Sequence, residues 1–458
     1  MEVKTARRPE IYICAGGLAV MAVLYIRWAL TAGPPGAAGY IAAFASAALF
    51  TGICLRFVRG WMESWHTLGR SREEPSPETG ERPNTGIKIF LLFLAADIWM
   101  IVFVYFLRLA AGYRESFGAA LNFWTCTDSQ HYLAIARDWY LSEGSVDRLV
   151  QLVFLPGYPL AVRAVNYAVG NYLISGLLVS ALSYAGAGVM LYKLMRLDYS
   201  RAASARAIKY LAIIPGGFFF AAPMSDSLFL LLSLGCVYFV RKEKWLTACL
   251  AGGLAAFTRS LGLLLLVPAL FHLISLSTDK NLRGQVSPWK RLGQFAGLLL
   301  IPAGFAAYCW INYRVSGDPF KFMEYQREHW GQQMGLFFNT ASYQTENVIA
   351  CFRSGRISDA LGLWIPNLLA QLFALLLMLK TAKKLRPDYT AWFIAYFAVA
   401  IGATWLLSAP RYLIGLPVIY AGFAELTERR RADIAAAAGC VILSLLYAWA
   451  FIMRWQVW

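Results

Sequence analysis

The stretch IKIFLLFLAADIWMIVFVYFLRLAA, residues 87–111, decides the kind of fold, because it is almost entirely apolar over its whole length. A helix that crosses a lipid bilayer needs about 20 predominantly apolar residues, and this stretch is long enough. Similar apolar runs recur along the chain, and 59% of its 458 residues are hydrophobic. In lipid the backbone must satisfy its own hydrogen bonds, which helices do. The sequence therefore predicts an all-α, polytopic integral membrane protein.

The composition excludes a soluble multidomain protein and argues against a nucleic-acid partner. Only 15% of the residues are charged, whereas soluble proteins carry about 25%. The chain has 42 Lys plus Arg against 26 Asp plus Glu, a formal net charge of +16. These cations lie in short clusters between apolar runs, a pattern typical of contacts with anionic membrane lipids and of membrane topology.

Keeping the basic clusters on the cytoplasmic side of the membrane predicts about thirteen spans, short ones included. The N-terminus is expected in the cytoplasm, and residues 1–86 are expected to hold two extra N-terminal spans followed by a polar, disordered cytoplasmic loop after Arg70. Residues 87–458 hold the other spans. Two long loops in this part, residues 112–170 and 314–356, are predicted on the extracytoplasmic side.

Two segments must be placed individually if all basic clusters are to stay on the cytoplasmic side of the membrane. Residues 154–170, FLPGYPLAVRAVNYAVG, are expected to lie along the outer interface as an amphipathic helix, although a crossing stays open. The apolar run 245–276 is too long for one span and contains Arg259 near its middle. A cation at that depth costs about 2.5 to 3.5 kcal/mol on insertion scales. Two short helices meeting at an outer tip, with Arg259 in a water-filled cavity, avoid that cost.

The sequence predicts no metal site and no cofactor. Its eight cysteines form no CxxC pair and no zinc-ligand spacing, and it has four histidines in all. No phosphate-binding glycine loop, dinucleotide fingerprint or HExxH helix is present in a plausible context.

The predicted external loops carry the unusual polar residues. Asp128 heads DSQHYLAIARDWY, whose apolar positions recur with helical spacing, so its carboxylate is expected at the N-terminal end of an interfacial helix. His131 and Tyr132 follow within one turn. The simpler alternatives are that Asp128 caps this helix and that His131 is a hydrogen-bonded interfacial anchor.

Three further charged residues lie at predicted outer junctions: Asp226 in AAPMSDSLF, Arg259 in TRSLG and Arg411 in SAPRYL. An arginine buried near lipid needs an anionic partner, either a protein carboxylate or a lipid phosphate. The alternatives are that Asp226 caps the following helix and that Arg411 extends to the headgroups. Acids and arginines at one mouth of a helical bundle indicate an anionic, lipid-linked substrate.

Six motifs follow one another along the chain: DSQHYLAIARDWY, FLPGYPL, APMSDSLF, LAAFTRSLGLLLL, GDPFKF with Gln326 and Trp330 downstream, and PRYL. In this order, over about residues 121–426, they resemble the PIG-V-like mannosyltransferases of the GT-C superfamily, whose eukaryotic members add the second mannose to GPI anchors. The family usually has Trp directly before the loop acid, where this chain has Thr127.

The resemblance implies a GT-C-like bundle in residues 87–458 that transfers a sugar, mannose in this family, from a polyprenyl-phosphate donor to a lipid or glycan acceptor with inversion. Asp128 is then the expected general base. Short basic loops favour a bacterial cell membrane, with the active site extracytoplasmic. The residues expected to bind substrate are His131, Tyr132, Asp226, Arg259, Arg411 and Asp318.

Two alternatives stay open. A lipid-linked substrate transporter or flippase without transferase activity would also have broken helices and charges within the membrane, although no inverted repeat is visible in the sequence. A retaining transferase would need a second carboxylate as nucleophile about 5 Å from the first. Asp226 is the candidate for that role, but we expect it to orient the acceptor or the base.

Overall fold

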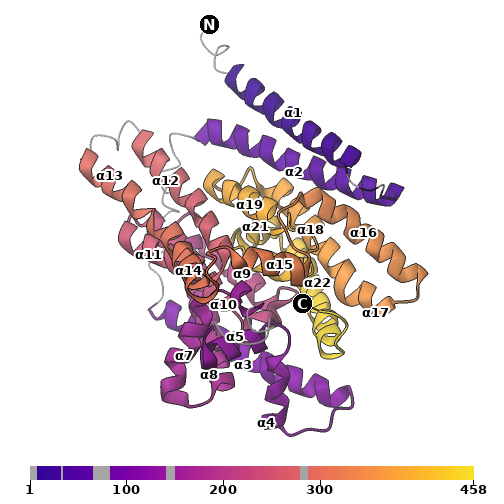
Figure 1. Cartoon of the computed structure of the whole chain (residues 1–458). Helices are drawn as coiled ribbons and strands as arrows, with labels where there is room; N and C mark the ends of the chain where they lie inside the picture. Colours follow the sequence, from indigo (N-terminus) through magenta and orange to yellow (C-terminus); the bar gives the residue numbers. More distant parts are fainter. Residues whose placement is uncertain are drawn as a thin grey trace.

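The structure, a computed structural model, describes residues 8–31, 33, 35–64, 83–140, 150–278 and 287–457. Within these residues the chain is a bundle of helices, and the only β-type pairing is an isolated antiparallel bridge between Met334 and Ala403 (Figure 1). The predicted all-α class is therefore confirmed. The predicted disordered loop falls largely on residues 65–82, which lie outside the described residues.

Eight helical segments in the described part of the chain are long and apolar enough to cross a membrane, which confirms a multi-pass membrane protein. The other five predicted spans fall on helices of 9 to 16 residues: α9 (Arg201–Ile213), α10 (Asp226–Arg241), α11 (Trp245–Thr258), α19 (Pro387–Ala400) and α21 (Val418–Leu426). The count of about thirteen therefore stays a prediction, as does the orientation. The eight segments are Ile11–Thr31, Ala37–Met62, Thr85–Ala110, Tyr172–Met195, Ser260–Ser277, Pro288–Ser316, Ile357–Thr381 and Arg430–Ile452.

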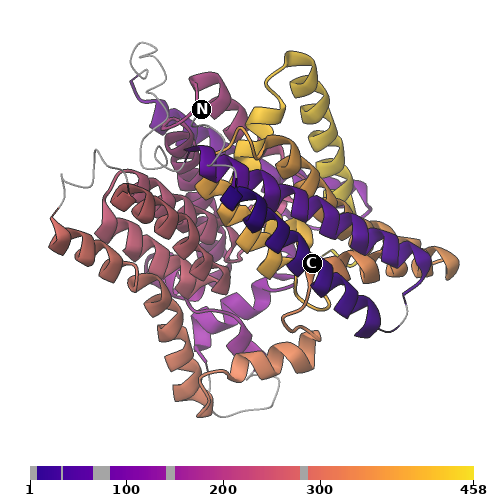
Figure 2. The ribbon, with the colours of Figure 1, turned by 90° about the horizontal axis from the view of Figure 1, so that it is seen from above.

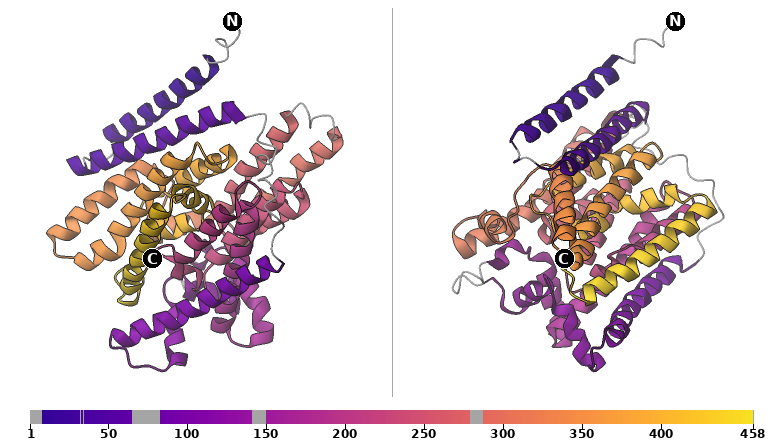
Figure 3. Two further views of the ribbon diagram at one scale, coloured as in Figure 1. Left: turned by 180° about the vertical axis from the view of Figure 1, so that it is seen from behind. Right: turned by 90° about the vertical axis from the view of Figure 1, so that its right-hand side faces the viewer.

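The N-terminal helices α1 (Arg8–Thr31) and α2 (Ala37–Ser64) form a hairpin along one side of the molecule (Figures 2 and 3). Helix α2 packs against α16 (Phe337–Arg353), α18 (Ile365–Thr381) and α19 (Pro387–Ala400). Two polar contacts join the hairpin to α16: Trp28 Nε1 donates to Asn339 Oδ1 at 2.8 Å, and Gly39 N donates to Glu346 Oε1 at 2.8 Å.

Both predicted external loops contain helices. The segment 112–170 holds α4 (Phe117–Ala120), α5 (Ser129–Asp138) and α7 (Gly157–Val169). Helix α7 has only 13 residues, about 20 Å, which is shorter than the hydrocarbon core of a bilayer. The segment 314–356 holds α15 (Lys321–Trp330) and α16, and α16 packs into the bundle.

The remaining helices bring distant parts of the chain together at one end of α10. The predicted break at Arg259 is present, because α11 ends at Thr258, Arg259 is extended with φ −149°, and a short 3-10 helix follows. Gly262 permits this close turn, since a Cβ there would lie 2.3 Å from Ala256 N. The other helices are α3 (Thr85–Ala110), α8 (Tyr172–Met195), α9 (Arg201–Ile213), α10 (Asp226–Arg241), α11 (Trp245–Thr258), α12 (Leu266–Thr278), α13 (Pro288–Gly297), α14 (Leu300–Ser316), α17 (Ile357–Asp359), α20 (Ala409–Ile414), α21 (Val418–Leu426) and α22 (Arg430–Ile452).

Candidate active site

Four charged side chains from four separate segments meet at this end of the bundle. Arg259 donates to Asp226 Oδ1, and Arg411 Nη1 donates to Asp128 Oδ2. Arg411 Nε donates to Asp226 Oδ2 at 2.9 Å, and Arg411 Nη2 forms an ion pair with the same oxygen at 2.9 Å. Asp128 precedes α5, Asp226 begins α10, Arg259 follows α11, and Arg411 lies in α20. We call this set, Arg259–Asp226–Arg411–Asp128, the four-charge chain.

The two carboxylates of the four-charge chain differ in exposure. The side chain of Asp226 is 0% exposed and lies between the two guanidinium groups, whereas that of Asp128 is 29% exposed. Burying a carboxylate is costly unless it is paired and hydrogen-bonded, and Asp226 meets both conditions. Asp226 therefore neutralises and orients the arginines, while Asp128 can meet a substrate.

The structure decides the alternatives that the sequence left open for these residues. Asp128 is the N-cap residue of α5, but its side chain makes no capping hydrogen bond and turns to Arg411. Arg411 does not extend to headgroups, since its side chain is 6% exposed between two carboxylates. The side chains of Asp128 and Arg411 therefore form tertiary ion pairs, and neither makes the helix cap or the headgroup contact that was the alternative.

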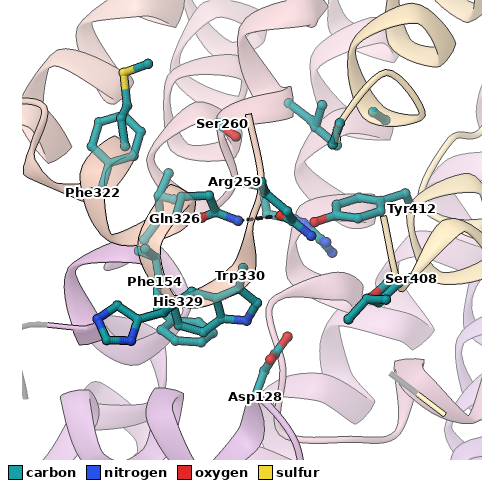
Figure 4. A pocket seen from close by; sticks show the side chains of 18 of the residues that line it. Asp128, Phe154, Arg259, Ser260, Phe322, Gln326, His329, Trp330, Ser408 and Tyr412 are labelled. Atoms are coloured by element: carbon teal, nitrogen blue, oxygen red, sulfur yellow. Dashed lines mark hydrogen bonds between the residues drawn. The ribbon is translucent and has the colours of Figure 1, made fainter. Parts of the chain in front are cut away.

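A cavity of about 910 Å³ opens over the four-charge chain (Figure 4). Asp128, Arg259 and Arg411 line it, together with Tyr132 of α5, whose hydroxyl hydrogen-bonds to Ser225 Oγ at 2.8 Å. Burial raises the pKa of Tyr132 to about 12, so its hydroxyl stays neutral at physiological pH. Another part of the lining comes from α15, including Gln326 and Trp330, and we call it the α15 wall. Ser408 and Tyr412 also line the cavity.

Aromatic rings support the guanidinium groups. Arg259 lies over the ring of Tyr412 at 5.3 Å and of Phe229 at 5.8 Å, and Arg411 lies over Phe219 at 5.7 Å. A cation near an aromatic face is attracted by the ring quadrupole. The rings thus help to hold both arginines at the cavity without adding charge.

The structure does not bring His131 or Asp318 into the lining of the cavity, although both were expected to bind substrate. His131 stacks on Phe154, with ring centroids 4.7 Å apart, and Phe154 lines the cavity in its place. Asp318 Oδ1 accepts a hydrogen bond from Phe320 N at 2.8 Å and so shapes the turn that leads into α15. His131 therefore supports Phe154, and Asp318 supports the start of α15.

Sequence analysis did not assign the α15 wall to the site. Phe322, Gln326, Arg327 and His329 of this helix line the cavity beside Trp330. The GDPFKF motif, with Gln326 and Trp330 downstream, indicated this segment, but the spacing of its residues did not indicate which face of α15 lines the site. Among the described residues, no group of three or more His, Cys, Asp and Glu side chains is arranged to hold a metal ion.

Comparisons with known proteins find similarity among solved structures, and it is distant. No protein-family model matches this chain, and no curated protein matches it. Among solved structures, it is similar to the crystal structure of ArnT from Cupriavidus metallidurans bound to undecaprenyl phosphate, with a TM-score of 0.47 and 14% sequence identity, over 82% of this chain and 76% of that one.

Proposed function

We propose that this chain is an inverting glycosyltransferase that moves a sugar, mannose as its motifs indicate, from a polyprenyl-phosphate carrier to an acceptor hydroxyl on the extracytoplasmic face of the membrane. The observation that carries the proposal is the four-charge chain beside the cavity. Both guanidinium groups of this chain and one of its two carboxylates reach the cavity, and its second carboxylate stays buried between the arginines.

The arginines suit the phosphate of a lipid-linked donor. A guanidinium group binds phosphate oxygens through two parallel hydrogen bonds, and Arg259 and Arg411 present two such groups to the cavity. The leaving polyprenyl phosphate is already ionised, so it needs cations to stabilise its growing charge and no proton. The bound phosphate competes with Asp128 for Arg411 and so frees that carboxylate to act as a base.

Asp128 takes the proton of the acceptor hydroxyl as its oxygen attacks the anomeric carbon. The bond from that carbon to the phosphate oxygen breaks at the same time, and its electron pair leaves on the polyprenyl phosphate. One displacement inverts the configuration. Asp226 is a poor candidate for the nucleophile of a retaining reaction, because it has no exposed surface and both its oxygens accept from arginine.

The test is the Asp128→Asn variant in membranes supplied with labelled polyprenyl-phosphate mannose. Asn keeps the size and can still accept from Arg411, but it is a very weak base. We expect transfer to fall by about 10²-fold or more while donor binding is retained. Asp138→Asn, at the exposed end of the same helix, is the matched control.

Transfer near the parent rate in Asp128→Asn would remove Asp128 as the base. A parent protein that moves the labelled lipid across the membrane without transferring its sugar would instead support the transporter alternative.

A further inference from the structure

Gln326 and Trp330 of the α15 wall bring an uncharged amide and an aromatic ring to the cavity that Arg259 and Asp128 also line (Figure 4). We propose that Gln326, Gln332 and Trp330 form the subsite for the donor's sugar ring and that this subsite selects an uncharged hexopyranose. The inference rests on the proposed function and adds the part of the site that recognises the sugar.

Gln326 is held in place with hydrogen-bonding capacity to spare. Its Nε2 donates to Gln332 Oε1 at 2.5 Å, and Gln332 Nε2 in turn donates to the carbonyl of Trp405 at 3.1 Å. No described residue hydrogen-bonds to Gln326 Oε1, and its amide has a second N–H. The free carbonyl and N–H can accept from and donate to neighbouring sugar hydroxyls, from a side chain that is already ordered.

Trp330 supplies an apolar surface beside these amide groups. Its ring lines the cavity and packs edge-on against Phe154, with centroids 6.0 Å apart and an interplanar angle of 79°. A pyranose ring presents C–H groups on its faces and hydroxyls around its edge. An indole ring next to a primary amide therefore matches both kinds of surface.

Backbone pairing connects the proposed subsite with the segment that leads to Arg411. Gly335 N donates to Gly402 O at 2.7 Å, and Thr404 N donates to Gln333 O at 2.9 Å. The backbone that carries the sugar subsite is thus joined to the backbone that leads to Arg411, which fixes the separation between the two. Such a separation is what one molecule carrying a sugar on a phosphate requires.

The charges around the cavity favour an uncharged sugar. Among the described residues that line it, the carboxylates are Asp128 and Glu324, and each already has a cationic partner, Arg411 and Lys321 respectively. Arg327 adds a further cation to the α15 wall. An amino sugar with its ammonium group would have to break the Lys321–Glu324 pair or occupy Asp128, the carboxylate that the acceptor hydroxyl needs, whereas hydroxyl groups need only the amides.

The experiment compares the binding of two probes to the purified full chain: a short-chain polyprenyl phosphate and its mannosyl ester. We expect Gln326→Leu and Trp330→Leu each to weaken binding of the ester by about tenfold and to leave binding of the bare phosphate unchanged. Gln130→Leu, at an exposed position of α5, and Trp310→Leu, at a 59% exposed position of α14, are matched controls that should bind both probes like the parent.

Parent-like binding of the ester in both variants would overturn the sugar subsite and leave the proposed function standing. An equal loss for both probes would also overturn it, because the change would then not be specific for the sugar. An amino-hexosyl ester that binds the parent as well as the mannosyl ester would overturn selection for an uncharged ring. A parent that binds neither probe would remove the proposed function as well.

Discussion

Asp128 and Asp226 both accept hydrogen bonds from Arg411, yet their surroundings give them different physical roles. Asp226 is fully buried and balances two guanidinium groups, whereas Asp128 reaches the cavity. Removing one member of a buried ion pair leaves an unbalanced charge in a medium of low polarity, which is costly. Asp128 is partly exposed, so water can take over part of its interaction with Arg411 when the carboxylate is removed.

The first prediction at this scale contrasts the two carboxylates. We expect Asp226→Asn to lower the free energy of unfolding by about 3–5 kcal/mol, because two buried arginines lose their common anion. Asp128→Asn should lower it much less. Thermal unfolding of the purified proteins in one detergent measures the difference, and equal losses in the two variants would contradict these roles.

The second prediction at this scale is a pH dependence of stability caused by His131, which stacks on Phe154. Burial lowers the pKa of His131 from 6.5, against the opposing effect of Asp128. The unfolded chain therefore binds the proton at a higher pH than the native chain does. The contribution of neutral His131 to the stability of the fold is complete above about pH 6.5 and is lost as the pH falls through the lower pKa of the native state.

Replacing His131 by Phe keeps the ring stack and removes the titration. We expect His131→Phe to lose less stability than the parent between about pH 7.5 and 5, as measured by the midpoint of thermal unfolding. Identical pH dependence in the two proteins would show that His131 does not cause it.

At the scale of elements, buried amides on α16 and α18 hold the irregular backbone that precedes α20. Asn367 Oδ1 accepts from Ala409 N at 2.6 Å, and its Nδ2 donates to Leu407 O at 3.0 Å. Gln344 Nε2 donates to Leu406 O at 3.1 Å. A non-helical segment inside a membrane bundle must have its backbone groups satisfied by protein, and these side chains satisfy them. Arg411 depends on them for its position.

We therefore expect Asn367→Leu to weaken donor binding and transfer by about tenfold or more, because the buried backbone groups of Ala409 and Leu407 lose their partner. Asn347→Leu is the control, since the Asn347 amide donates to a carbonyl of its own helix.

A double-mutant cycle separates positioning from general instability. If Asn367 acts through Arg411, then Arg411→Lys should cost less in the Asn367→Leu background than in the parent. Additive losses in donor binding would show that the two residues act independently.

At the scale of the whole molecule, two charge clusters occupy opposite ends of α10. Asp226 is its first residue and Arg241 its last, and a helix of 16 residues is about 24 Å long. At the far end Arg241 donates to both oxygens of the buried Asp198, at 2.6 and 2.8 Å. The site thus lies at one end of the bundle, and the basic segment near Arg241 lies at the other.

The basic clusters predict that the end with the site faces outward. In a variant without the eight native cysteines, a membrane-impermeant thiol reagent should label Gln130→Cys and Gln333→Cys from outside intact cells, but not Glu243→Cys. All three positions are exposed, so access depends on the side of the membrane. Labelling of Glu243→Cys alone would reverse the orientation.

The sequence by itself determined the class of the protein and several local features of the site. Long apolar runs predicted membrane helices because the bilayer fixes their length, and the charge of Arg259 predicted a break because a cation is costly in lipid. The break is present, and Asp128 does directly precede a helix, α5. These features depend on neighbours along the chain, so a pattern in the sequence can reveal them.

Only the tertiary structure decided how these residues work together. Asp128 and Arg411 are 283 positions apart, and Gln332 and Trp405 are 73 apart. Nothing in the neighbouring sequence distinguishes Asp226 as the buried carboxylate, or shows that His131 and Asp318 do not line the cavity. Whether a side chain reaches the cavity depends on how helices pack, and packing combines many weak contacts between distant segments. The sequence therefore predicted the residues of the four-charge chain, but it could not predict their pairing or the α15 wall.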